Sequence, residues 1–486
     1  MGDDGMWSEP IRSFLATFSE ELEADNAAIF AGAGLSRAAG FVDWKLLLKS
    51  VASALDLDIE KETNLVALAQ YFCNARLGSR GRINKLLLDK FSPDVDITDN
   101  HRILARLPIS TYWTTNYDRL IERALEDAGK RPDVKHTVEQ LALTVPHRDA
   151  VVYKMHGDIS DPSKTVLIKD DYERYHLSRA AFITALTGDL VSKTFLFLGF
   201  SFTDPNIDYI LSRIRVGFDL NMRTHYCFMK RLDAKDYPDK EVLAYKSRQQ
   251  ALFINDLLRF NVETLLLDSY GQITEILTDL NRIFRSRSVF LSGAAHEWGA
   301  GWTMDRARKL VRELSKTLID KGYRLVSGFG YGVGSAVISG ALEQIYATKR
   351  GKMEDQLTLR PFPYDIIGST DWEATARRYR EDMAEYAGAA VFMFGNKLKD
   401  GEVVLSDGVA QEFEVCRAKG LAVIPVGATG SMAGELWKQV MGDFATYFPQ
   451  RTDQFQPLMQ KLGDVDAEPA VLIDTIVQIL ELWAQG

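Results

Sequence analysis

Two side chains in the first half of the chain, Asn116 and His156, carry groups suited to chemistry on a hydroxyl or a water molecule. An imidazole has a pKa of about 6.5 and can accept a proton near neutral pH. A carboxamide both donates and accepts hydrogen bonds, so it can orient a hydroxyl group or an attacking water. Asp118 follows Asn116 closely and could orient one of these groups or act as an acid in the first turn of a helix. The sequence therefore offers a general base and an orienting amide, provided that the fold brings them together.

The stretch from Ala27 to Ser36 predicts a phosphate-binding turn. Its first five residues are small or apolar, as expected for a strand buried on both faces of a parallel sheet. Gly32 and Gly34 let the backbone turn sharply and approach a ligand closely. Ser36 is expected to cap the next helix, whose N-terminus favours a phosphate. The residues expected to contact a dinucleotide here are Ala31, Gly32, Ala33, Gly34 and Ser36. An ordinary strand-to-helix turn has the same features, so this stretch alone leaves both interpretations open.

Three more polar clusters follow apolar runs. The predicted strands 110–115 and 150–155 end at Asn116 and His156, and the strand 194–198 runs into Gly199. Ser201 and Asn206, in the loop after Gly199, complete the predicted binding residues. Each cluster has a plain alternative: an amide that caps the helix 119–127, a simple turn at the histidine, or the mere end of a strand. Because the carboxyl ends of parallel strands meet at one sheet edge, we expect the clusters to form one site.

The second half repeats this pattern with different side chains. Two glycine loops follow apolar runs and resemble phosphate-approaching loops, and a carboxylate near the start of the helix 409–418 could bind ribose hydroxyls. Three basic side chains at or near strand or helix ends, Arg360, Arg380 and Lys397, could meet phosphates, although ordinary solvated charges are the more common explanation for each. The candidate ligand-binding residues of this half are Ser292, Gly293, Gly330, Gly332, Arg380, Lys397 and Glu412.

Composition narrows the class of protein. The chain has 486 residues, too many for one ordinary core, and its 46% hydrophobic and 26% charged residues are typical of globular proteins. A net charge of −9 argues against general nucleic-acid binding. No apolar run approaches the about 20 residues of a membrane-spanning helix. We therefore expect no association with a membrane and expect the protein to be cytoplasmic. Three scattered cysteines argue against a disulfide framework and against a cysteine zinc site, so no metal is expected.

Strand, loop and helix alternate along the whole chain, which predicts an α/β fold with two tandem Rossmann-like domains and parallel sheets. The basic, serine-rich segment 285–288 lies between a helix and a new strand. We place the boundary there and predict domains of residues 1–284 and 285–486. A single helix is expected over 45–55 in the first domain.

The motifs of the first domain resemble those of the sirtuin (SIR2) superfamily. The matching segments are Gly32-Ala33-Gly34-Leu35-Ser36, Thr115-Asn116-Tyr117-Asp118, His156-Gly157 and Gly199-Phe200-Ser201, in the same order. The resemblance implies an NAD pocket with Asn116 and His156 as the catalytic pair. Sirtuin deacylases also carry a cysteine zinc module, which this chain lacks, and the loop from Gly40 to Trp44 differs from theirs. Without an acyl-lysine acceptor, water is the expected nucleophile and NAD hydrolysis the expected reaction.

The second domain resembles the SLOG branch of Rossmann-like domains, which is related to phosphoribohydrolases that act on cytokinin precursors. Glu412 matches the glutamate of their motif, whereas Leu405–Ala410 replaces its glycine-rich part. This departure favours ligand binding without turnover.

The two domains in this order resemble the SIR2–SLOG effectors of bacterial Thoeris anti-phage defence over essentially the whole chain. That resemblance implies an NADase that a cyclic ADP-ribose isomer, made by a partner TIR protein, activates through the SLOG domain. It also implies homotetramers, filaments on activation, and a signal pocket that contains Arg380, Lys397 and Glu412 with Ser292 and Gly293.

The prediction from the sequence is therefore an NAD glycohydrolase with a nucleotide-sensing second domain. An NAD-dependent protein deacylase is the first alternative, disfavoured by the missing zinc ligands. A non-catalytic protein whose two nucleotide sites only assemble a complex is the second. Asn116 and His156 disfavour that alternative because both follow the expected strands.

Overall fold

The computed structural model describes residues 7–484 apart from 42–43, 76–78, 201, 203–206, 209, 213–214, 216–222, 300, 349–352, 362–371 and 450–451. The chain divides into two compact units, Met1–Asn281 and Arg282–Gly486. This division falls inside helix α15 (Gly271–Ser286), whereas the sequence places the boundary after residue 284. Within the described ranges, no helix combines the length and apolar character that crossing a bilayer requires.

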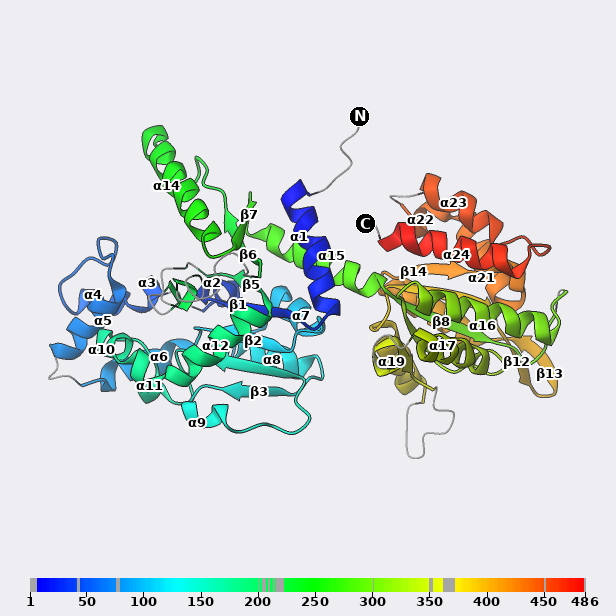
Figure 1. The fold of residues 1–486 in the computed structure, drawn as a ribbon, viewed down its shortest axis with the longest axis horizontal. Coiled ribbons are helices and arrows are strands. Elements are labelled where there is room, and N and C mark those ends of the chain that lie inside the picture. The colour runs from blue at the N-terminus through cyan, green and yellow to red at the C-terminus, as the bar shows by residue number, and fades with distance from the viewer. Residues whose placement is uncertain are drawn as a thin grey trace. The chain divides into compact units, whose positions relative to one another are not determined.

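A seven-stranded parallel sheet forms the centre of the first unit, in the order β3-β4-β2-β1-β5-β6-β7 (Figure 1). Its strands are β1 (Ala27–Ala31), β2 (Thr111–Thr114), β3 (Pro132–Lys135), β4 (Ala150–Lys154), β5 (Thr194–Leu198), β6 (His225–Lys230) and β7 (Val262–Leu267). The chain builds one side of the sheet from β1 through β4 and then returns to place β5 on the other side of β1. The strand order therefore reverses beside β1, and in open sheets of this kind ligands bind at the carboxyl ends at such a point.

Helices lie on both faces of this sheet, and helices α3–α6 lie beside its carboxyl edge. They are α1 (Glu9–Glu23), α2 (Ala33–Arg37), α3 (Trp44–Leu47), α4 (Lys49–Ser53), α5 (Leu65–Asn74), α6 (Gly81–Phe91), α7 (Asp99–Arg106), α8 (Leu120–Asp127), α9 (Val138–Leu141), α10 (Lys169–Glu173), α11 (Tyr175–Ser178), α12 (Ala180–Ser192), α14 (Lys240–Leu258) and α15. Aromatic residues fill the interior: Phe30 stacks on Phe197 with ring centroids 5.3 Å apart, and Trp113 stacks on Tyr153 at 4.2 Å. A second apolar cluster joins α3–α6 to Tyr117 and so holds these helices beside the carboxyl edge of the sheet.

The turn after β1 and the end of β5 lie unusually close together. The Gly32 N–H donates to the Leu198 carbonyl at 2.8 Å, and the Gly34 N–H donates to the Gly199 carbonyl at 2.9 Å. A Cβ on Gly199 would lie 2.2 Å from the backbone nitrogen of Leu35, and the φ of Gly199 is +61°. Glycine is therefore required at 199 both for space and for backbone conformation.

The second unit contains a five-stranded parallel sheet of order β10-β9-β8-β11-β14. Its strands are β8 (Ser288–Ala294), β9 (Arg324–Ser327), β10 (Leu357–Leu359), β11 (Ala389–Phe394) and β14 (Ala422–Pro425). The order reverses between β8 and β11, so this sheet also has a switch point at its carboxyl edge. A separate antiparallel hairpin, β12 (Asn396–Lys399) and β13 (Glu402–Leu405), follows β11 directly.

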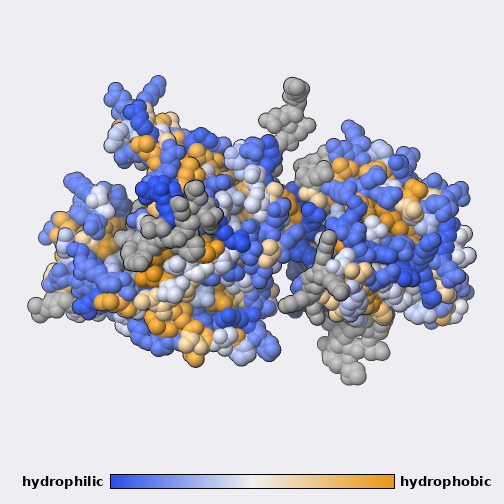
Figure 2. Space-filling view, viewed as in Figure 1, coloured by the Kyte–Doolittle hydropathy of each residue, from blue (hydrophilic) through white to orange (hydrophobic). Residues whose placement is uncertain are grey.

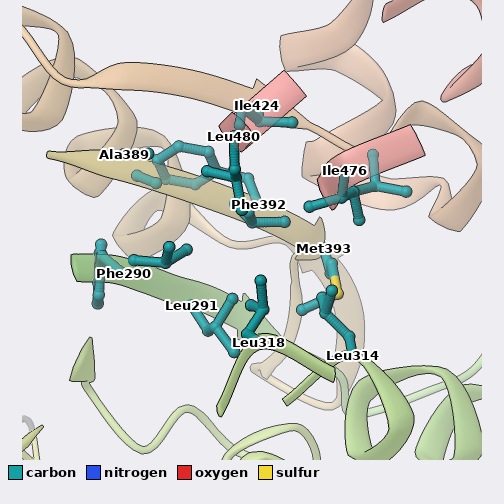
Figure 3. Close-up of a cluster of buried hydrophobic side chains, with 14 of the residues drawn as sticks. Phe290, Leu291, Leu314, Leu318, Ala389, Phe392, Met393, Ile424, Ile476 and Leu480 are labelled. Carbon is teal, nitrogen blue, oxygen red and sulfur yellow. The ribbon is translucent and has the colours of Figure 1, made fainter. Parts of the chain in front are cut away.

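Helices pack on both faces of the second sheet as well. They are α16 (Met304–Asp320), α17 (Gly334–Thr348), α18 (Met353–Gln356), α19 (Trp372–Ala384), α20 (Asp407–Ala418), α21 (Ser431–Gly442), α22 (Phe444–Tyr447), α23 (Thr452–Lys461) and α24 (Pro469–Ala484). Figure 3 shows part of this core, in which Phe392 and Met393 of β11 lie beside Leu291 of β8, Leu314 of α16 and Ile476 of α24. Hydrophilic residues cover most of the face seen in Figure 2, interrupted by small apolar patches.

The predicted fold class, two Rossmann-like units with parallel sheets, is confirmed. Two local predictions are wrong. Ser36 does not cap the helix after β1, because α2 begins at Ala33 with Gly32 as its N-cap and contains Ser36 in its last turn. The expected helix over 45–55 is two short helices, α3 and α4, separated at Leu48.

Candidate functional site

A cavity of about 940 Å³ opens at the carboxyl ends of β1, β2, β4 and β5. It lies within the size range of about 300–1,000 Å³ that is usual for ligand sites. The predicted residues that line it are Gly32, Ala33, Gly34, Ser36, Asn116, Asp118, His156 and Gly199. Ala31 is not among its lining residues; it ends β1, and its carbonyl accepts a hydrogen bond from Thr114 Oγ1 at 2.9 Å. Ser201 and Asn206 lie outside the described residues.

Asn116 is held by the turn that follows β1. Its Nδ2 donates to the Gly32 carbonyl at 3.0 Å and to Ser36 Oγ at 2.9 Å. Since a backbone carbonyl can only accept, the NH₂ of the amide must face Gly32, and both of its hydrogens are used. Only Oδ1 is left for a ligand, so Asn116 offers the site an acceptor rather than both amide groups. It does not cap helix α8, which begins at Leu120.

His156 sits in the turn directly after β4 and is 1% exposed. The rings of Tyr172 and Tyr175 meet its imidazole edge-on, at centroid distances of 5.6 and 6.3 Å. The Val166 N–H donates to the His156 carbonyl at 2.9 Å, which ties this turn to the segment before α10. The imidazole is therefore fixed in an aromatic pocket at the cavity wall.

Asp118 precedes α8 and is 4% exposed. Its Oδ1 accepts a hydrogen bond from the Leu120 N–H at 3.0 Å, whereas Oδ2 accepts none from the described residues. Burial lowers the pKa of nearby His101 to about 4, although the charge of Asp118 opposes that shift. Asp118 thus fixes the start of α8, and its second carboxylate oxygen is buried.

A fully buried lysine lies beneath these loops. Lys154, the last residue of β4, is 0% exposed, and its Nζ donates to the carbonyls of Tyr117 (3.2 Å) and Asp118. The same Nζ forms ion pairs with Glu122, at 3.0 Å, and with Asp158. Burial disfavours the ammonium charge, but the two carboxylates outweigh burial and raise the pKa of Lys154. One cation therefore joins the loop that carries Asn116 to the turn that carries His156.

Several lining residues of the first cavity were not predicted. Trp44, Asn64 and Phe91 come from the helices α3–α6 or their ends, and Tyr172 comes from α10. Nothing in their local sequence marks them, because the packing of these helices brings them to the sheet edge. Lys154 did leave a signal, since a charged residue inside an apolar strand run requires buried partners.

The second unit has a cavity of about 1280 Å³ at the carboxyl ends of β8, β9 and β11. Ser292, Gly293, Gly330, Arg380, Lys397 and Glu412 line it, and Gly332 is not among its lining residues. Gly332 instead fits against the carbonyl of Ala295, which a Cβ would approach to 2.2 Å. The structure thus gathers six of the seven predicted residues around one space.

Charged groups in the second cavity are paired with one another. Ser292 Oγ donates to Glu412 Oε2 at 2.6 Å, and Arg380, 8% exposed, lies near this carboxylate. Burial raises the pKa of Glu412, although the Ser292 hydrogen bond and the charge of Arg380 oppose it. Lys397 on the β12–β13 hairpin pairs with Asp407 at the start of α20, and this hydrogen bond lowers the pKa of Asp407. Acidic and basic side chains therefore both line this space, and Arg380 and Lys397 are the basic groups among the predicted residues.

The structure gives no sign of a metal centre in the parts that it describes: no three His, Cys, Asp or Glu side chains there gather as ligands. Cys73, Cys227 and Cys416 are each buried as free thiols.

Comparisons with known proteins match both halves of the chain. A family model described as SIR2-like domain matches residues 110–251, and one described as Sir2- and TIR-associating SLOG family matches residues 272–482. The NAD(+) hydrolase ThsA of Bacillus cereus (strain MSX-D12) is 49% identical over 97% of this chain and 98% of that protein. The proteins of the same name from Acinetobacter baumannii (strain 532279) and Cytobacillus dafuensis are each 46% identical, over 95% and 96% of this chain and 97% and 96% of their own lengths.

The buried ion cluster of Lys154, Glu122 and Asp158 leads to a prediction about the stability of the first unit. Lys154→Met should destabilise the first unit by about 3–5 kcal/mol, because Glu122 and Asp158 would keep buried charges without a partner. Adding Glu122→Gln should restore part of this loss. Thermal and urea unfolding of the full chain measure both effects. The control is Lys164→Met, which removes an exposed ion pair with Asp161 and should cost less than about 1 kcal/mol. Equal stability of the Lys154 and Lys164 variants would contradict the role of the cluster.

Proposed function

Because the chain belongs to the family of the NAD(+) hydrolases ThsA, we propose that its first unit hydrolyses NAD+ to nicotinamide and ADP-ribose. One observation carries this proposal: a single cavity at the switch point of the first sheet gathers the glycine turn, Asn116 and His156. A glycine turn at the start of a helix suits a pyrophosphate, and the two side chains suit the ribose. NAD+ is the substrate, and no metal takes part in the reaction.

The reaction breaks the bond between nicotinamide and ribose through an oxocarbenium-like state. His156 acts as general base and takes a proton from a ribose hydroxyl or from the attacking water. The tyrosine rings around it fix its orientation before substrate binds. Water adds to the ribose carbon, nicotinamide leaves, and one proton is released for each NAD+ consumed.

Asn116 positions the nucleophile. With both amide hydrogens bound to Gly32 and Ser36, its Oδ1 accepts a hydrogen bond from a ribose hydroxyl or from the water. Ser36, although not a helix cap, thus acts by orienting the amide. Asp118 belongs to the substrate-contacting residues of this proposal because it lines the same cavity.

The two residues should behave as one catalytic unit. Asn116→Ala and His156→Ala should each remove nearly all NAD+ cleavage, and the double variant should be little worse, because residues that act together lose activity non-additively. Release of nicotinamide, followed by chromatography under activating conditions, measures this. The matched control, exposed His147→Ala, should keep the wild-type rate. A single variant that is folded and retains half of the wild-type rate would refute the assignment.

The second unit serves as the sensor in this proposal. A cyclic ADP-ribose isomer, made by a TIR-domain partner, binds its cavity and activates the first unit, so that NAD+ is depleted in the cytoplasm during anti-phage defence. Three features support this: the basic groups of the cavity, the Ser292–Glu412 pair, and the SLOG family model. Arg380 and Lys397 bind the phosphates of the signal through charge-assisted hydrogen bonds, and Glu412 binds its ribose hydroxyls. A ligand activates only if it prefers the active state, so signal binding and NADase rate are linked.

Loss of one phosphate contact should raise the signal concentration needed for activation and leave the maximal rate of NAD+ hydrolysis unchanged. Arg380→Ala should raise the half-activating concentration of the signal about ten- to a hundredfold, as expected for a charged hydrogen bond of about 1.5–3 kcal/mol, and should reach a similar maximal rate. The control is Arg378→Ala, an exposed arginine on the same helix that does not line the cavity. NADase titrations with cyclic ADP-ribose isomers test both variants. An unshifted curve for Arg380→Ala would overturn the sensor assignment.

We also propose that the protein is a homo-oligomer, a tetramer that forms filaments on activation. Helix α14 supports this: it spans 19 residues, has Leu257 as its buried residue, and exposes Val242, Tyr245 and Leu252 on one face. An exposed apolar row on a long helix is typical of a surface that another subunit covers.

Light scattering tests the oligomer directly. Wild type should have about four times the chain mass of 54.7 kDa, and Leu252→Glu should dissociate it, since a charge in a covered apolar surface is unfavourable. Leu177→Glu, at a residue 74% exposed on α11, is the control and should leave the mass unchanged. A monomeric wild type would refute the proposal, and a tetrameric Leu252→Glu would remove α14 from the interface.

A further inference from the structure

Two aromatic side chains stay exposed at the edge of the second cavity. His296, after β8, and Tyr331, in the glycine loop after β9, both line the cavity. Their rings stack with centroids 5.9 Å apart and planes at 24°. Tyr331 is 67% exposed. The cavity thus contains a flat aromatic surface that the phosphate and ribose contacts proposed above do not use.

Hydrogen bonds fix the two loops that carry this pair. The Ala295 N–H donates to the Tyr331 carbonyl at 2.8 Å, and the His296 N–H donates to Asn396 Oδ1 at 2.8 Å. Asn396 Nδ2 in turn donates to Ser431 Oγ at 3.0 Å and to the carbonyl of Glu297 at 2.9 Å. The backbone on both sides of the stack is therefore tied down. The stacked rings are thus carried by loops whose backbone is fixed before any ligand binds.

The chemistry of the cavity leaves one part of a nucleotide unassigned. Arg380 and Lys397 suit phosphates, and Glu412 with Ser292 suits ribose hydroxyls. A base needs a flat apolar partner, and each base stacked on an aromatic side chain typically gains about 1–3 kcal/mol. An exposed, pre-stacked tyrosine at the rim is the described group that fits this need.

We propose that Tyr331, backed by His296, is the base-stacking subsite of the second cavity and binds the purine ring of the activating nucleotide. The inference rests on the sensor function proposed above and extends it to recognition of the base. The alternative is that the pair only braces the two loops.

Activation of the full-length protein separates these roles. A panel of cyclic ADP-ribose isomers is screened on wild type, and the isomer that activates at the lowest concentration becomes the probe. Tyr331→Ala should raise its half-activating concentration about five- to a hundredfold, and Tyr331→Phe should stay within about twofold of wild type, because stacking needs the ring and not the hydroxyl. Tyr346→Ala, at a residue 68% exposed on α17 and absent from the cavity lining, is the matched control.

A probe without a base completes the test. Ribose 5-phosphate should compete with the activating isomer. Its inhibition constant, corrected for the affinity of each protein for the activator, should be the same in wild type and in Tyr331→Ala. Equal weakening of both probes would show a bracing role and overturn the inference, as would an activation curve for Tyr331→Ala within about twofold of wild type. If no isomer activates wild type, the sensor function itself fails, and the subsite assignment fails with it. That outcome appears before any variant is made, so the two failures are distinguishable.

Discussion

One buried ammonium group is the constraint on which the first site depends. Lys154 Nζ contacts two backbone carbonyls of the loop after β2 and carboxylates from α8 and from the turn after β4. Without that cation, the carboxylates of Glu122 and Asp158 would be buried without a countercharge, which is costly. Asn116 lies one residue before this carbonyl pair, and His156 lies midway between Lys154 and Asp158. The relative placement of the two reactive side chains therefore follows from a single electrostatic cluster, and the aromatic packing around His156 refines it.

Much of the fold could be predicted from the sequence because the informative patterns are local. Each apolar run that ends in a polar cluster is a parallel strand, so Asn116, His156 and the glycine turn meet at one cavity. The patterns failed where local rules compete: Gly32 takes the N-cap position expected for Ser36, whose hydroxyl accepts from Asn116 instead. The pairing of Lys154 with Glu122 and the position of helices α3–α6 beside the cavity could not be predicted, since both depend on contacts between distant segments. The β12–β13 hairpin did carry a signal, because Asp400-Gly401 is a typical two-residue hairpin turn, and both residues have positive φ.

Both units place a cavity at the switch point of a parallel sheet, but the side chains that line the two cavities differ. Both cavities open where the strand order reverses, yet the first concentrates an imidazole and an amide, and the second concentrates paired charges. In the second, Lys397 already holds the carboxylate of Asp407, and Glu412 already accepts from Ser292. An anionic ligand must exchange with these internal partners, so its affinity is a difference between two sets of contacts. This difference fits the proposed division of roles, with selective binding in the second unit and NAD+ hydrolysis in the first.

The central claim is that occupancy of the second unit controls NAD+ hydrolysis in the first. The most direct measurement is to incubate the purified full-length protein with NAD+, with and without cyclic ADP-ribose isomers and an acetyl-lysine peptide, and to identify all products by chromatography. We expect nicotinamide and ADP-ribose in equal amounts, a strong rate increase with one isomer, and an unchanged peptide. NAD+ consumption that no isomer alters, or deacetylation in step with NAD+ loss, would contradict it.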